Sequence, residues 1–183
     1  MFIKKKNYYI IIEKINDFDL DLIRIKKKFN IIYRPSIREN FADVSRFRMK
    51  CKSKGVNFYV ANDVHYATKV RSDGLYISSY NASITTATFK EKIGSAHNVR
   101  EIMQKKKQGC KRIVFSRLFK TDYKIKKSYS GIHRFNLLNF NQNLIPLGGI
   151  RNKNLLKLQL VNSDSFVIMS EVKKKPAIIS RLF

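Results

Sequence analysis

The sequence predicts an α/β protein, a small (β/α)8 TIM barrel with trimmed helices. Eight short runs of β-branched, aromatic and other apolar residues recur along the chain, and segments with helical spacing lie between most of them. The runs are nearly continuous rather than alternating, which is typical of parallel strands that are buried on both faces. A doubly wound open sheet is the alternative. At 183 residues the chain is short for a barrel, so several helices must be short, notably those near 63–72 and 173–183.

The elements follow in order along one expected domain, 1–183. The expected strands are YYIIIEKI (8–15), IIYRPS (31–36), NFYVAN (57–62), GLYIS (74–78), KIGSAH (92–97), RIVFSRLF (112–119), LIPLGGI (144–150) and SFVIMSEV (165–172). The expected helices, besides the two short ones, are 17–29, 40–55, 98–109 and 152–162, and Asn98 with Glu101 three residues later has the spacing of a capping box. The segments 78–92 and 120–136 show no clear periodicity, and we expect them to be weakly structured.

The composition is strongly basic, with 38 Lys and Arg against 13 Asp and Glu, a net charge of +25. One interpretation is a polyanion partner such as nucleic acid; the other is a compositional bias toward residues with A/T-rich codons. Lysine triplets at 4–6, 26–28, 105–107 and 173–175 are spread along the chain, and the aromatic residues lie mostly within apolar runs. Both facts favour the bias, and a nucleic acid partner is the weaker hypothesis.

Two cysteines without a CxxC spacing, Cys51 and Cys110, exclude a disulfide framework and fit a reducing, cytoplasmic compartment. The apolar run near the amino terminus is interrupted by Glu13 and Lys14, and is too short for a signal peptide or a membrane span. We therefore expect no membrane partner, and a homo-oligomer is left open.

Two adjacent glycines end the seventh expected strand, in a chain with only seven glycines. In a barrel, the loops after strands seven and eight often form a phosphate site. Gly148 and Gly149 would let backbone N–H groups reach a phosphate, and Ser170 at the end of strand eight would add a hydroxyl. The alternative is a tight strand-to-helix turn that holds no ligand.

The segment IPLGGIRNKN, followed a dozen residues later by SDSFVIMSEV, resembles the "iPvvAIGGI…eN…GadGvAvvsai" ending of the thiamine phosphate synthase/TenI family. NFYVANDVHYATKVRSDGLYIS, KIGSAHNVREI and GCKRIVFSRLFKTDYK are similar to further motifs of that family, in the same order, and IIYRPS is a weaker match to its "vqlReK" strand. The resemblance covers roughly 57–172.

The resemblance implies a transferase that joins hydroxymethylpyrimidine pyrophosphate to thiazole phosphate and releases pyrophosphate. It implies that Gly148, Gly149 and Ser170 hold the thiazole phosphate. Lys124 matches the lysine of the "TpTK" loop and Thr121 its first threonine. Arg34 matches the arginine of the "vqlReK" strand, where it would contact pyrophosphate.

The family holds Mg²⁺ on two aspartates, and here the sequence departs from it. Counted back from the shared Asp73-Gly74, the first aspartate falls on Asn62; a one-residue gap would match Asn62-Asp63 to the "ND" pair instead. The second aspartate falls on Asn81. Amide ligands bring no charge, so Mg²⁺ would be held weakly unless a substrate pyrophosphate supplies charge or lysines replace the ion.

Two hypotheses therefore remain beside nucleic acid binding: an active transferase acting on small phosphorylated substrates, or a degenerate member that binds a phosphorylated ligand without this reaction.

Overall fold

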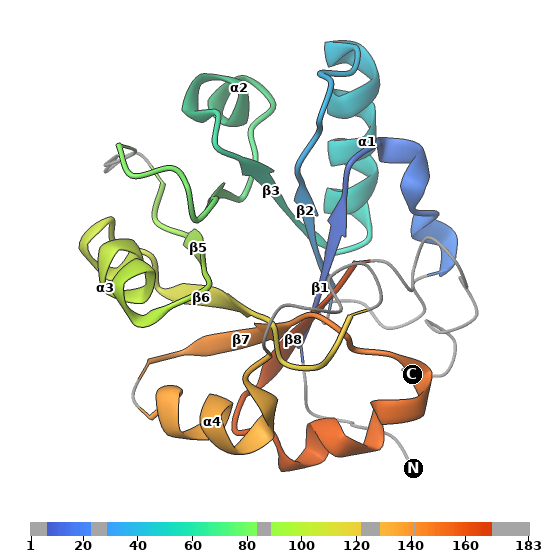
Figure 1. Ribbon diagram of the computed structural model, residues 1–183. Helices are drawn as coiled ribbons and strands as arrows, with labels where there is room; N and C mark the ends of the chain where they lie inside the picture. Colours follow the sequence, from blue (N-terminus) through green and yellow to red (C-terminus); the bar gives the residue numbers. More distant parts are fainter. Residues whose placement is uncertain (1–6, 23–28, 84–88, 122–128, 141, 170–183) are drawn as a thin grey trace.

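Eight parallel strands close into a barrel in the computed structural model, which describes residues 7–22, 29–83, 89–121, 129–140 and 142–169 (Figure 1). The strands are β1 (Asn7–Ile12), β2 (Phe29–Tyr33), β3 (Asn57–Ala61), β4 (Gly74–Ile77), β5 (Lys92–Ala96), β6 (Arg112–Ser116), β7 (Leu144–Leu147) and β8 (Ser165–Ile168). Each strand pairs with the next in sequence, and β1 also pairs with β8, with Tyr8 opposite both Phe29 and Phe166. This closure confirms the predicted barrel and excludes the open sheet.

The helices lie around the outside of the barrel (Figure 1). They are α1 (Phe41–Ser53), α2 (Val64–Lys69), α3 (Val99–Lys107) and α4 (Gly131–Leu138). The α2 helix is as short as expected, and Asn98 caps α3 by accepting a hydrogen bond from the Glu101 N–H at 2.9 Å. Among the described residues, no helix has the length and apolar character that a membrane crossing requires.

Three expectations about helices and loops were wrong. The 120–136 segment contains the start of α4, whose first residue, Gly131, has a φ of +68° and gives no helical signal in the sequence. The helix expected at 152–162 is a pair of 3₁₀ helices, η4 (Asn152–Asn154) and η5 (Leu156–Leu160). The described part of 17–29 holds 3₁₀ turns, η1 (Ile15–Asp17) and η2 (Leu20–Leu22), and the start of β2. The expected helix at 173–183 lies outside the described residues.

The strands are apolar on both faces because both faces are covered. Alternate residues of β1 illustrate this: Tyr9 and Ile11 point into the barrel interior, whereas Tyr8, Ile10 and Ile12 pack in the outer layer, between the strands and the elements around them. The interior is filled by Tyr9, Ile11, Ile32, Tyr59, Tyr76, Ile93, Val114, Ile145 and Val167. The barrel interior is thus a packed core rather than a pore, and a ligand can bind only at the ends of the barrel.

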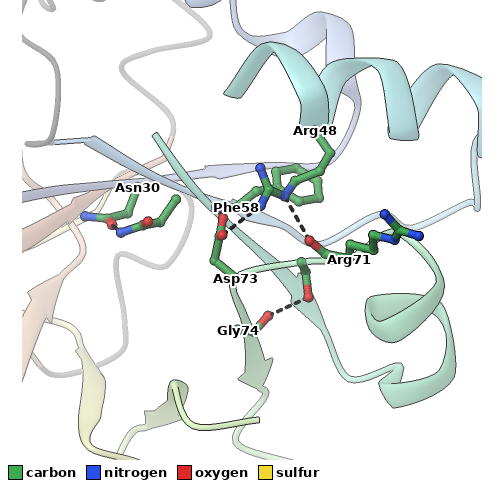
Figure 2. Close-up of polar contacts among 8 residues, drawn as sticks. Asn30, Arg48, Phe58, Arg71, Asp73 and Gly74 are labelled. Carbon is green, nitrogen blue, oxygen red and sulfur yellow. Dashed lines mark hydrogen bonds and ion pairs between the residues drawn. The ribbon is translucent and has the colours of Figure 1, made fainter. Parts of the chain in front are cut away.

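An ion pair between the buried Arg48 and the partly exposed Asp73 fastens α1 to the amino-terminal side of β4 (Figure 2). Arg48 donates from Nη2 to Asp73 Oδ1 at 2.7 Å and from Nε to the Arg71 carbonyl at 3.1 Å. The second oxygen of Asp73 accepts the N–H of Phe58 at 2.7 Å. One carboxylate therefore joins a helix and two strands on the face opposite the candidate site.

Candidate functional site

The carboxyl ends of the strands bring a set of polar groups to one face of the barrel, which we call the mouth. It includes Arg34 after β2, Asn62 and Asp63 after β3, Ser78 after β4, His97 after β5, Arg117 after β6 and Gly148 and Gly149 after β7. Parallel strands place all these residues at the same end, which is where the active sites of (β/α)8 barrels lie. Gly148, Gly149, Arg34, Asn62 and Asp63 are thereby placed on one face, as expected.

The glycine pair lies against the loop that follows β6. Gly148 and Gly149 have φ values of +101° and +67°, which glycine adopts readily and other residues adopt at a cost. A Cβ on Gly149 would lie 2.5 Å from the carbonyl oxygen of Lys120 and 2.7 Å from that of Phe119. The Phe119 N–H donates to the Gly148 carbonyl at 3.0 Å. The close backbone approach that two glycines permit is therefore, first of all, an approach to this loop.

The same pair also has backbone donors that are not used within the described part of the protein. Among the described residues, no hydrogen bond uses the backbone N–H of Gly148 or Gly149. The carbonyl of Gly149 is held by Asn154 Nδ2 at 2.7 Å, and Asn154 Oδ1 accepts the N–H of Arg151 at 2.7 Å. The turn is thus fixed by Asn154, and its N–H groups have the chemistry needed to receive an anion.

Arg117 stands beside the glycines. A Cβ on Gly148 would lie 3.0 Å from the Arg117 side chain, and the Arg117 guanidinium donates to the buried Thr121 hydroxyl at 2.9 Å. Thr121 was expected at this site on the resemblance, and it supports a cation that the sequence did not single out. Lys124 and Ser170 lie outside the described residues.

Arg34 reaches across the mouth from β2. Its N–H donates to the Ile12 carbonyl at 2.9 Å, and its Nη2 lies 3.9 Å from Met169 Sδ, which packs on the interior cluster. Its charge also acts on Tyr76 in the barrel interior: burial raises the pKa of the Tyr76 hydroxyl, while the hydrogen bond with Ser95 and the charge of Arg34 lower it. Arg34 is therefore half-buried over the barrel axis, and among the described residues its guanidinium meets only the weak acceptor Met169 Sδ.

The side chains of Asp63 and Asn62 are both engaged within the protein. Asp63 caps α2 by accepting the Tyr66 N–H on Oδ1 at 2.8 Å, and its Oδ2 pairs with the Arg38 guanidinium. Asn62 accepts the Ser78 N–H on Oδ1 at 2.8 Å and donates from Nδ2 to the hydroxyls of Ser78 and Tyr80 at 2.8 and 3.0 Å. These contacts join the carboxyl ends of β3 and β4.

Asn81 is held by two side chains of α3. Its carbonyl oxygen accepts from Lys105 Nζ at 2.7 Å and from Gln108 Nε2 at 3.1 Å. Lys105 is fully buried, in space that the missing side chain of Gly94 leaves open, and burial lowers the pKa of its ammonium. Lys105 thus fixes the loop that carries Tyr80 and Asn81.

Residues 62, 63 and 81 do not fit a Mg²⁺ site of the kind that the family resemblance implies. A hard cation needs several open oxygen ligands, preferably charged ones. Asp63 is the one carboxylate of the three, and both of its oxygens are occupied. The described residues contain no group of three His, Cys, Asp or Glu side chains placed to hold a metal.

A serine and a histidine also meet at the mouth. Ser116 Oγ lies 3.1 Å from Nδ1 of the exposed His97, at the ends of β6 and β5. The sequence suggested no pairing, because the two residues lie on different strands. Arg38 and Arg117 were also missed. The place of Arg117 directly after β6 is a signal that could have drawn attention to it, whereas Arg38 lies within the loop between β2 and α1.

The model of one protein family, described as thiamine monophosphate synthase, matches residues 7–172. A thiamine-phosphate synthase from Prochlorococcus marinus is 28% identical over 138 residues, which are 72% of this chain and 40% of that protein. The chain therefore spans about two fifths of the length of this curated relative.

Solved structures show the same fold. A thiamine phosphate pyrophosphorylase from Pyrococcus furiosus superposes with a TM-score of 0.75 at 16% identity, covering 97% of this chain and 91% of that one. A thiamine phosphate pyrophosphorylase from Bacteroides thetaiotaomicron gives a TM-score of 0.65 at 13% identity, with 97% and 93% covered. A 3-keto-L-gulonate-6-phosphate decarboxylase from Vibrio cholerae gives 0.65 at 12%, with 98% and 99% covered. Because the family model spans most of the barrel, this chain belongs to the thiamine monophosphate synthase family.

Proposed function

We propose that this protein is a transferase of thiamine biosynthesis, which couples hydroxymethylpyrimidine pyrophosphate to thiazole phosphate and releases pyrophosphate. The observation that carries the proposal is the phosphate-type cradle at the end of β7. There, Gly148 and Gly149 have unused backbone N–H groups, the stem of the Arg117 side chain packs against Gly148, and Thr121 accepts a hydrogen bond from the Arg117 guanidinium. The cradle would take the phosphate of the thiazole, and Ser170 and Lys124 remain predicted members of the site.

This reaction requires the protein to position the substrates and to neutralise charge; it does not require a nucleophilic side chain. The bond between the pyrimidine methylene and the pyrophosphate oxygen breaks, and its electron pair leaves with pyrophosphate. The thiazole nitrogen then donates its lone pair to the methylene carbon and forms the new C–N bond. Guanidinium groups at fixed positions would neutralise the departing charge, and a substrate held at the cradle would present its nitrogen in the right orientation. We expect Arg34 to contact the leaving group.

The test is product formation. Purified protein with both substrates should release pyrophosphate and form thiamine phosphate, measured by the fluorescence of the oxidised product. Arg117→Ala should raise the KM for thiazole phosphate about tenfold or more, as expected for a lost charge-assisted contact. Arg46→Ala is the matched control, because Arg46 is a solvent-exposed arginine on α1 whose ion-pair partner within the described part of the chain is the nearby Asp43. No thiamine phosphate from the wild-type protein would refute the proposal.

A second function is favoured by one observation at the same mouth. Asp63 is committed to Arg38 and to the α2 cap, and amides stand at the other two expected metal positions. A member that binds a phosphorylated ligand without catalysing the reaction is consistent with this arrangement. Calorimetry separates the two functions: binding of thiazole phosphate with no product from the paired substrates supports the non-catalytic member.

A further inference from the structure

The side of the mouth formed by β2, β3 and β4 already contains a cation in the place where the family resemblance puts a metal. The Arg38 guanidinium pairs with Asp63 Oδ2, and its carbon lies 5.0 Å from the centre of the Tyr66 ring. Tyr66 is the residue whose N–H binds the other oxygen of the same aspartate. Asp63 and Tyr66 therefore hold Arg38 from two sides, one by charge and one by a cation–π contact.

A metal ion would have to break this arrangement. Binding to Asp63 Oδ2 would displace the guanidinium, and binding to Oδ1 would remove the helix cap. Binding to Asn62 Oδ1 would take the acceptor from the Ser78 N–H, at 2.8 Å, and release the network that also orients Tyr80. Each step leaves a polar group of the protein without its partner, which costs free energy.

The third expected metal position faces a second fixed positive charge. The ammonium of Lys105 donates to the backbone carbonyl of Asn81 at 2.7 Å, so a divalent ion bound at the neutral side chain of this residue would also meet repulsion from that nearby positive charge. Four contacts, to Asp63 Oδ1, Asp63 Oδ2, Asn62 Oδ1 and the Asn81 backbone, thus disfavour a cation here.

The same geometry favours an anion. Only Nη2 of Arg38 is engaged, and its remaining N–H donors have no acceptor among the described residues. Arg34 comes from the same loop, four residues earlier, and its donors meet only the weak acceptor Met169 Sδ. Guanidinium groups bind phosphate oxygens through paired N–H donors, so two of them on one loop are suited to a ligand with two phosphates.

We propose that the β2–β4 side of the mouth binds pyrophosphate ligands without a divalent cation, and that Arg38 supplies the charge that a metal would otherwise provide. This inference rests on the proposed function, since it assigns the site of the leaving group. The proposed site differs from the one that the family resemblance implies, because it binds pyrophosphate without a metal ion. Arg38 is fixed to the fold through Asp63 and Tyr66, so its charge does not depend on the concentration of a divalent cation.

Calorimetric titration with inorganic pyrophosphate tests the inference without requiring turnover. Binding should be seen in the presence of EDTA. Adding Mg²⁺ should change the affinity no more than its own complexation of free pyrophosphate accounts for. Binding that needs Mg²⁺ would overturn the inference and leave the proposed function standing. Absence of binding under both conditions would also overturn it, and the thiamine phosphate assay would then decide the proposed function separately.

The Arg38→Ala variant tests whether Arg38 supplies the positive charge that binds pyrophosphate. It should weaken pyrophosphate binding by about tenfold or more, as expected for a lost charge-assisted contact, and should fold normally because Arg38 is exposed. Arg46→Ala removes the same charge from the same neighbourhood of sequence and should leave the affinity within about twofold, as expected for an exposed charge screened by salt. An equal loss in both variants would show non-specific attraction to a basic protein and would refute the role of Arg38.

Discussion

Replacing Gly149 by alanine tests what the glycine pair does for the fold. The new Cβ would lie 2.5 Å from the Lys120 carbonyl oxygen and 2.7 Å from the Phe119 carbonyl carbon and oxygen, and all three atoms belong to the backbone. A φ of +67° costs a non-glycine residue about 1–2 kcal/mol. Forcing the loop away adds an overpacking cost of about 1–3 kcal/mol. We expect Gly149→Ala to lower the free energy of unfolding by about 2–5 kcal/mol in total, a large part of the stability of a small domain.

Gly131→Ala is the matched control for this experiment. Gly131 has nearly the same φ, +68°, but its added Cβ would meet nothing within 4 Å. It should therefore show the backbone cost alone, about 1–2 kcal/mol. Urea denaturation followed by circular dichroism gives both values, provided that the m-value stays constant. If the two variants are equally destabilised, the contact with the Phe119–Lys120 backbone does not constrain the turn, and our account of the glycine pair is wrong.

Two other predictions concern buried charges. Arg48→Ala should destabilise the protein by about 1–3 kcal/mol, because it removes a charge-assisted hydrogen bond from the partly exposed Asp73 carboxylate, which keeps the Phe58 N–H; no measurable loss in urea denaturation would contradict this. Burial lowers the pKa of Lys105 in the folded protein below the ordinary value of 10.5, so the charged ammonium destabilises the fold at lower pH. Between the folded and unfolded pKa values the unfolded chain binds one more proton than the folded protein. The free energy of unfolding should therefore rise with pH across this interval. The difference in unfolding free energy between the wild type and Lys105→Met, measured against pH, should show this rise; a flat difference would mean that Lys105 titrates normally in the folded state.

The strands and their number followed from local sequence. Tyr8 to Ile12 are all apolar, and such a run is stable only where both faces of the sheet are covered, so the barrel could be inferred before any contact was known. The cap of α3 was equally local, because Asn98 and Glu101 lie three residues apart. The α4 helix was missed because Gly131 begins it in a conformation that has no signature in sequence.

The mouth could be predicted only in part. The order of the motifs placed Gly148, Arg34 and Asn62 at strand ends, since parallel strands bring their carboxyl ends to one face. The partners of these residues could not be predicted. Arg38 and Asp63 are 25 residues apart in sequence, and only the packing of β2 beside β3 brings them together.

The sequence by itself determined the barrel, the family and part of the set of polar groups at its mouth. These depend on hydrophobic periodicity and on motifs, which are properties of short segments. The tertiary structure decided what those groups bind to. It turned an expected metal carboxylate, Asp63, into the partner of Arg38, and it placed the glycine pair against the loop after β6. The physical reason is that hydrogen bonds and ion pairs between strands depend on distances across the barrel, and no local pattern specifies those distances.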